Sequence, residues 1–251
     1  MPRALTSEFR KLGTVRSPWL LLALGPLIVV AGISGLVASG GNVHDPALQG
    51  RAFAHVGLAA LFTLVFGILA VAGEYSRGTM TDTLLSFPGR RSVITAKLAA
   101  YGAVGAAAGL VSAGVALLVT EAWWSAKGGT LHLSASGTWR TLGGGVAANA
   151  ALAAIGVGVG ALVRNLVAAV AAALAWVAVV EGIAGQLIGS GLARWLPFSA
   201  SEALDRAGGT PGSGLLPGRL LPQWGGGLVL LGYAALFAAA ALLITLKRDV
   251  T

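Results

Sequence analysis

The fold of this chain is decided by the segment AFAHVGLAALFTLVFGILAVAG, residues 52–73, in which no Asp, Glu, Lys or Arg interrupts the apolar run before Glu74. As an α-helix, this segment would be about 33 Å long, which matches the roughly 30 Å of hydrocarbon in a bilayer. A helix of this length that is apolar on all sides is typical of a membrane span. We therefore interpret residues 52–73 as a transmembrane helix.

The rest of the chain repeats this pattern. Hydrophobic residues make up 56% of the sequence and charged residues only 10%, whereas a soluble domain carries about 25% charged residues. Such a chain cannot cover a water-facing surface, so the sequence predicts an all-α membrane protein that forms a single transmembrane domain over residues 1–251. The six predicted spans are residues 18–38, 52–73, 94–120, 141–163, 166–188 and 226–246.

The basic residues predict the orientation, because Lys and Arg are enriched in cytoplasmic loops. With the N-terminus inside, the inner segments hold more of these residues than the outer segments. Inside are Arg3, Arg10, Lys11, Arg16, Arg77, Arg90, Arg91, Lys97, Arg164, Lys247 and Arg248, and outside are Arg51, Lys127, Arg140, Arg194, Arg206 and Arg219. We therefore expect both termini to be cytoplasmic and the protein to be a multi-pass protein of the bacterial plasma membrane.

Three segments outside the spans have distinct patterns. Residues 2–16 place Leu5, Phe9 and Leu12 at helical spacing, which predicts an amphipathic helix in the inner interface. Residues 74–92 form the longest predicted cytoplasmic loop, and residues 189–224 form an extracellular loop. The capping-box pattern from Ser199 to Glu202 predicts a short helix in that outer loop. The first apolar run exceeds the length of a signal-peptide core, so we expect a retained helix.

Several kinds of chemistry are excluded by the motifs. The chain has no cysteine, no G-x-x-x-x-G-K-[ST] and no H-E-x-x-H, so we expect no thiolate site, no P-loop and no zinc protease site. The histidines are scattered and do not have metal-ligand spacing. The net charge of +8 comes without a basic stripe with interleaved aromatic residues, so we expect no nucleic-acid partner. We expect no enzymatic activity and no cofactor bound by this chain.

Two short motifs resemble catalytic or cofactor signatures. The stretch from Gly156 to Ala161 formally fits a dinucleotide fingerprint, which requires a preceding strand and a following acidic residue. Because it lies inside an apolar span, we interpret Gly156 and Gly160 as a GxxxG helix-packing face. The stretch from Gly32 to Gly35 is similar to the serine motif of rhomboid proteases, but no histidine follows His132 to act as the base of Ser34.

Glu181 is the clearest carboxylate inside a predicted span. Burying an isolated charge at the centre of a membrane costs on the order of 2.5–3.5 kcal/mol, so such residues are functional candidates by default. Two interpretations of Glu181 remain open. It could belong to a proton or substrate path, or it could face an outer vestibule or the last outer loop.

The segment after residue 73 carries a resemblance to a known family. Its residues are Glu74-Tyr75-Ser76-Arg77-Gly78-Thr79, Leu84-Leu85-Ser86-Phe87-Pro88, Arg90-Arg91 and Lys97. This pattern resembles the segment between the second and third helices of ABC-2 type transporter permeases. Further similarity lies in Glu8-Phe9-Arg10-Lys11-Leu12, Arg16-Ser17-Pro18-Trp19, Leu162-Val163-Arg164-Asn165 and Lys247-Arg248-Asp249, so the resemblance spans nearly the whole chain.

The resemblance implies a permease subunit of an ATP-binding cassette transporter, which exports a lipid, drug or peptide. Such a permease pairs with a second permease copy, as a homodimer or heterodimer, and with two copies of a separate ATPase subunit that uses ATP. The resemblance also implies that residues 74–85 form a short coupling helix on the ATPase. The implied coupling residues are Glu74, Tyr75, Arg77, Gly78, Thr79, Leu84 and Pro88, and the implied path residues are Val65, Phe66, Val177 and Glu181.

Other interpretations compete with this one. Arg77 could pair with an acidic group of the ATPase, or it could face solvent or lipid phosphate. Gly78 and Thr79 are residues that shape turns. A stand-alone secondary transporter or channel that uses Glu181 is the main alternative function, and a membrane hydrolase built on Ser34 is a third.

Overall fold

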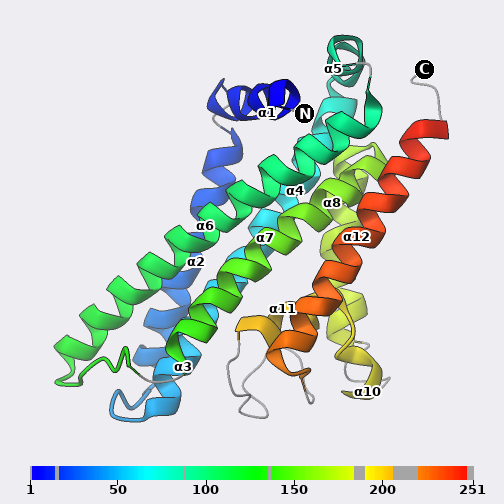
Figure 1. Ribbon diagram of the computed structural model, residues 1–251. Coiled ribbons are helices and arrows are strands. Elements are labelled where there is room, and N and C mark those ends of the chain that lie inside the picture. The colour runs from blue at the N-terminus through cyan, green and yellow to red at the C-terminus, as the bar shows by residue number, and fades with distance from the viewer. Residues whose placement is uncertain are drawn as a thin grey trace.

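The computed structural model describes residues 2–14, 17–87, 89–134, 137–183, 190–205 and 220–247, and in these segments the chain forms helices joined by turns, without a strand (Figure 1). Five helical segments of the described chain are long and apolar enough to cross a membrane. They are Ser17–Ala38, Pro46–Ser76, Arg91–Ala126, Thr138–Val163 and Gln223–Leu243. The prediction of an all-α protein with several helices that can cross a membrane is therefore confirmed for the described residues.

The second predicted span is built from three consecutive helices. They are α3 (Pro46–Ala54), the 3₁₀ helix η1 (His55–Ala59) and α4 (Ala60–Ser76). The chain turns into α3 at Asp45, whose Oδ1 accepts a 2.9 Å hydrogen bond from the backbone N–H of Ala47, while Pro46 occupies the first turn. Because Asp45 and Pro46 together form a helix start, the helix begins at Pro46 rather than at Ala52.

The bundle is organised around α7 (Thr138–Val163), which packs against α4, α6 (Arg90–Ala126) and α12 (Gln223–Lys247). A Cβ atom added at Gly156 would overlap the carbonyl oxygen of Leu64, and one added at Gly160 would lie 2.7 Å from the carbonyl oxygen of Ile68. Both contacts are with α4. The predicted GxxxG packing face is therefore confirmed, and the dinucleotide fingerprint lies within a helix.

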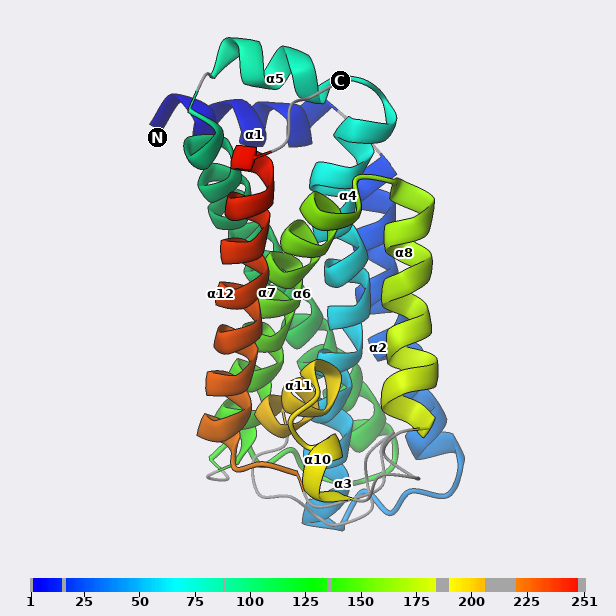
Figure 2. The ribbon, with the colours of Figure 1, turned by 90° about the vertical axis from the view of Figure 1, so that its right-hand side faces the viewer.

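The fifth predicted span is described only in part. Residues 166–175 form α8 (Leu166–Ala175), and a π-helical segment, η2 (Trp176–Glu181), follows it. Residues 184–188 of the predicted span lie outside the described residues. The helix from Leu166 to Glu181 is apolar but shorter than the five long segments. Figure 2 shows α8 running along the bundle beside α4.

The two ends of the bundle carry different short elements. One end holds α1 (Pro2–Thr14), α5 (Met80–Ser86) and the last turn of α12, and the other holds α3, α10 (Ser190–Ala193) and α11 (Pro197–Asp205) (Figures 1 and 2). The predicted outer-loop helix is present, although it begins at Pro197 and not at Ser199. Residues 206–219 of that loop lie outside the described residues.

Large apolar side chains cover the outer surface of the long helices. Leu20 on α2 (Ser17–Ala38) is 72% exposed, Leu118 on α6 is 73% exposed and Val167 on α8 is 77% exposed. A soluble monomer rarely exposes a continuous apolar surface of this extent, whereas lipid accepts it. Together with the five long apolar helices, this surface indicates a multi-pass membrane protein.

Candidate functional site

A buried lysine lies at the end of the bundle that carries α1 and α5. The Lys97 side chain, near the start of α6, is completely buried. Its Nζ atom donates to Glu8 Oε2 at 2.8 Å, to Glu74 Oε1 at 2.8 Å and to the carbonyl oxygen of Ala70 at 3.0 Å. Lys97 therefore ties α1 and α4 to α6 with three charge-assisted hydrogen bonds.

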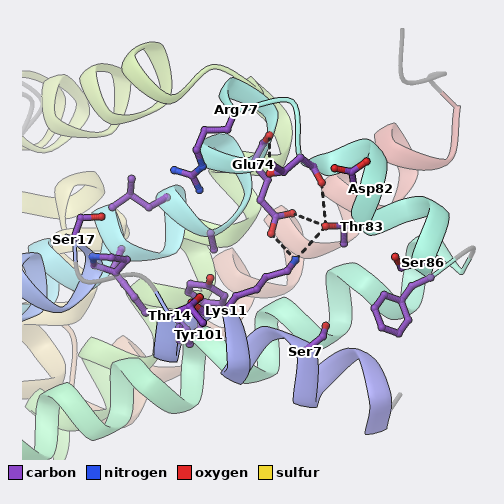
Figure 3. Close-up of a pocket in the computed structure, with 17 residues that line it drawn as sticks. Ser7, Lys11, Thr14, Ser17, Glu74, Arg77, Asp82, Thr83, Ser86 and Tyr101 are labelled. Carbon is purple, nitrogen blue, oxygen red and sulfur yellow. Dashed lines mark hydrogen bonds and ion pairs between the residues drawn. The ribbon is translucent and has the colours of Figure 1, made fainter.

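A second lysine completes the group. Lys11 Nζ on α1 donates to Glu74 Oε1 at 2.8 Å and to Thr83 Oγ1 at 3.1 Å (Figure 3). It also donates to Glu8 Oε1 at 3.1 Å. Burial lowers the pKa of Lys11, but the hydrogen bonds and charges of Glu74 and Glu8 outweigh it and raise the pKa above the ordinary lysine value. We call Glu8, Lys11, Glu74 and Lys97 the charge cluster. Its two cations balance its two anions.

The charge cluster joins elements that are distant in sequence. Glu8 and Lys11 lie one turn apart on α1, Glu74 lies in the last turn of α4, and Lys97 lies about two turns into α6. The hydroxyl of Thr83 on α5 also lies 3.4 Å from Glu74 Oε2. Removing one member of a buried ion pair leaves an uncompensated charge and costs about 3–5 kcal/mol. The cluster therefore specifies how α1 and α5 lie on the bundle.

The turn between α4 and α5 fixes the direction of the short helix. Gly78 has a φ of +71°, which lies in the left-handed region that glycine adopts without strain. The backbone N–H of Thr79 donates to the carbonyl oxygen of Glu74 at 3.0 Å, so the chain turns out of the axis of α4 at this point. The short helix therefore begins at Met80, and not at Glu74 as the resemblance implied.

The implied coupling residues have different surroundings. Glu74 is 6% exposed and is engaged by both lysines, so its carboxylate is not available to a protein partner. The Tyr75 ring lies 5.2 Å from the Arg164 guanidinium, and Leu84 is half-buried. Leu85, by contrast, is 77% exposed on α5. Pro88 lies outside the described residues.

A cavity of about 460 Å³ lies beside the charge cluster. Its walls come from α1, the start of α2, α4, α5 and α6, and they include Lys11, Phe66, Glu74, Arg77 and Tyr101. The Phe66 and Tyr101 rings pack against each other with their centroids 4.9 Å apart. A volume of this size is within the usual range of small-molecule sites, about 300–1,000 Å³.

The implied path residues do not share one surface. Phe66 is fully buried in the cluster of side chains around α1, α4 and α6, whereas Val177 packs against a different cluster that includes Phe198 and Leu230. Val65 is half-buried on α4. The structure therefore places Phe66 beside the cavity and Val177 on the opposite side of α4.

Glu181 lies on the side of the bundle that carries α11. Its side chain is 1% exposed, and Oε1 accepts hydrogen bonds from the backbone N–H of Phe198 at 2.9 Å and from Trp176 Nε1 at 3.2 Å. Oε2 accepts a 2.9 Å hydrogen bond from the backbone N–H of Ser199. These backbone donors belong to the first turn of α11, where a negative charge is stabilised. The Glu181 carboxylate thus holds η2 against α11 by hydrogen bonds.

Glu8 was named only within the resemblance, and Lys11 and Lys97 were named there and among the inner basic residues. No sequence pattern predicted that the three side chains meet. One signal was available for Lys97, which is the only charged residue between Arg91 and Glu121. A lone charge in an apolar run requires a partner of opposite sign. Ser34, on which the hydrolase interpretation was based, accepts a 3.0 Å hydrogen bond from Trp123 Nε1.

No protein-family model matches the chain, and no curated protein matches it. The resemblance to ABC-2 type permeases therefore stays a prediction.

Proposed function

We propose that this chain is the permease subunit of an ATP-binding cassette transporter and exports a lipid, drug or peptide. In this proposal the chain has six transmembrane helices, with residues 166–188 as the fifth, and both termini lie in the cytoplasm. The helix α1 lies in the inner interface, two ATPase copies bind at this end, and a second permease copy completes the transporter. The five long apolar helices, the resemblance around residues 74–97 and the lack of a P-loop in the sequence support this proposal.

The observation that carries the proposal is the position of α5. This helix projects at the end of the bundle that also holds α1 (Figure 1), and Leu85 on it is 77% exposed. A protein partner that covered Leu85 would remove apolar surface from water, which is favourable. The ATPase supplies such a partner.

The charge cluster connects α5, the proposed docking helix, to the membrane helices. Thr83 on α5 contacts Lys11 and Glu74, and Glu74 shares Lys97 with Glu8. When closure of the ATPase pair moves α5, this network transfers the movement to α1, α4 and α6 together. ATP hydrolysis in the partner thereby shifts the permease between its inward-open and outward-open states.

The alternative of a stand-alone transporter depends on Glu181 as a titrating carboxylate. The three hydrogen bonds that Glu181 accepts from Trp176, Phe198 and Ser199 support a structural role for this carboxylate, which holds η2 against α11. We therefore do not propose the second function.

The test is to isolate the tagged protein in mild detergent and to identify the proteins that accompany it. We expect a soluble ATPase to co-purify in stoichiometric amount and Leu85→Arg to remove it, because a charge would replace the apolar anchor. The matched control is Leu192→Arg, which changes a leucine that is 66% exposed on α10, at the opposite end of the bundle. Recovery of the wild-type chain without an ATPase, or equal loss with both variants, would refute the proposed docking role of α5.

A further inference from the structure

The cavity beside the charge cluster has one wall of polar groups and one of apolar groups. Hydroxyl groups of Thr14 and Ser17 line it near the junction of α1 and α2, and Leu12, Pro18 and Leu69 contribute apolar surface. The adjacent Trp19 is 47% exposed, and its Nε1 donates to the carbonyl oxygen of Leu12 at 2.7 Å. Tryptophan is enriched at membrane–water interfaces. The cavity therefore lies beside the start of α2, a helix long and apolar enough to cross a membrane.

Arg77 supplies a cation to this cavity. Figure 3 shows its side chain directed back along α4 towards Ser17 and not outward with α5. Its Nη2 atom lies so close to Gly73 that a Cβ atom added there would be 3.2 Å away. Among the residues that the structure describes, its guanidinium makes no hydrogen bond or ion pair. Lys11, the other cation in the cavity wall, is occupied by Glu8, Glu74 and Thr83.

Tyr101 supplies a second donor. Its side chain is 7% exposed and lines the same cavity, and its hydroxyl makes no hydrogen bond within the described part of the chain. The tyrosine lines the cavity, so its hydroxyl is a donor that a bound molecule can use. The ring is fixed against Phe66, so the hydroxyl keeps its position on the cavity wall.

We propose that this cavity binds the phosphate group of a phospholipid from the adjoining leaflet. The Arg77 guanidinium presents several donors to phosphate oxygens, and the Tyr101 and Ser17 hydroxyls add further donors. The lipid's glycerol and first acyl carbons lie against Leu12, Pro18 and Leu69. The site anchors the α1–α2 junction to the membrane. It does not depend on the proposed transport function, because it requires only that the chain is embedded in lipid.

The carboxylates in the cavity wall argue for one phosphodiester and against a larger anion. Glu74 and Asp82 also line the cavity, and Lys11 already balances Glu74. Arg77 and Asp82 are then the remaining charged groups of the wall, and Asp82 is exposed to solvent on α5. Arg77 is the cation that a phosphate oxygen can reach, and a single phosphodiester charge adds least repulsion from the two carboxylates. An acidic protein segment or a polyphosphate would bring additional negative charges close to these carboxylates.

The experiment measures lipid binding to delipidated protein in a neutral detergent. Dioleoyl phosphatidylglycerol is added, and native mass spectrometry gives the dissociation constant of the first bound lipid. We expect Arg77→Gln to weaken this binding by about ten-fold or more, because hydrogen bonds to charged groups are among the strong ones. We expect Tyr101→Phe to weaken it by about three-fold, since only the hydroxyl is removed. Arg91→Gln should leave it within about two-fold, because Arg91 is exposed like Arg77 but does not line the cavity.

Two further probes separate the possible ligands. Dioleoylglycerol has the same acyl chains without phosphate and should not bind to the site. Inorganic phosphate at millimolar concentration should not compete with the lipid, because it lacks the apolar contacts. Competition by inorganic phosphate would overturn the lipid assignment, and so would equal weakening by Arg77→Gln and Arg91→Gln.

Size-exclusion profiles and circular dichroism of each variant identify any variant that does not fold. Arg77→Lys, which keeps the charge, then serves as the second variant. The proposal is supported if Arg77→Lys weakens lipid binding by less than ten-fold but by more than Arg91→Gln does. It is contradicted if Arg77→Lys leaves lipid binding unchanged.

Discussion

Replacement of Lys97 by methionine tests the charge cluster directly. The Lys97 side chain is completely buried and donates to Glu8, Glu74 and the Ala70 carbonyl at 2.8–3.0 Å. Methionine has a similar length but no charge, so Lys97→Met leaves two buried carboxylates with only Lys11 to balance them. Breaking a buried ion pair in this way costs about 3–5 kcal/mol. We expect a loss of this size in the free energy of unfolding.

The assay is equilibrium unfolding of the purified protein in mixed micelles, with increasing SDS and circular dichroism as the signal. A double variant separates charge from shape. Glu8→Gln combined with Lys97→Met restores the balance of charge, because Lys11 and Glu74 remain as a pair. We expect the double variant to recover about 1–3 kcal/mol relative to the sum of the two single variants. Arg91→Met, which changes an exposed arginine at the start of α6, is the control and should cost less than about 1 kcal/mol.

Two outcomes would refute this reasoning. A loss below about 1 kcal/mol for Lys97→Met would mean that the carboxylates are not buried together as charged groups. Strict additivity of Glu8→Gln and Lys97→Met would mean that the two residues do not interact.

Three further predictions concern separate parts of the bundle. Gly156→Ala should destabilise the protein by about 1–3 kcal/mol, because the new methyl group would overlap α4; Gly143→Ala, where the space is open, should have no such cost in the same unfolding assay. Glu181→Gln should cost about 2 kcal/mol, since the amide NH₂ group would face an N–H donor of α11; unchanged protection of α11 in hydrogen exchange would contradict this. Gly78→Ala should cost about 1 kcal/mol, because its φ of +71° disfavours any side chain, and limited proteolysis between α4 and α5 should become faster; an unchanged cleavage rate would exclude strain at this turn.

Much of the fold could be predicted from the sequence because lipid imposes a simple condition. A span must be helical and apolar over about 20 residues, and such runs are visible without any knowledge of partners. The limits of the span predicted at 18–38 agree with the observed helix to within one residue at each end. The span predicted at 52–73 was short at its start because Asp45 and Pro46 begin a helix outside the apolar run. Chain length and hydropathy contain little information about such extensions.

The sequence by itself therefore determined the class of the protein, the approximate limits of the five long apolar helices and the packing role of Gly156 and Gly160. It did not determine the charge cluster, in which Glu8, Lys11, Glu74 and Lys97 come from three helices. Only the tertiary structure could decide which of the few charged residues meet, since each pair is fixed by the packing of whole helices. The same holds for Glu181, whose hydrogen-bond donors are backbone groups of α11. Backbone N–H groups are present in every sequence, and the fold alone brings particular ones to a carboxylate.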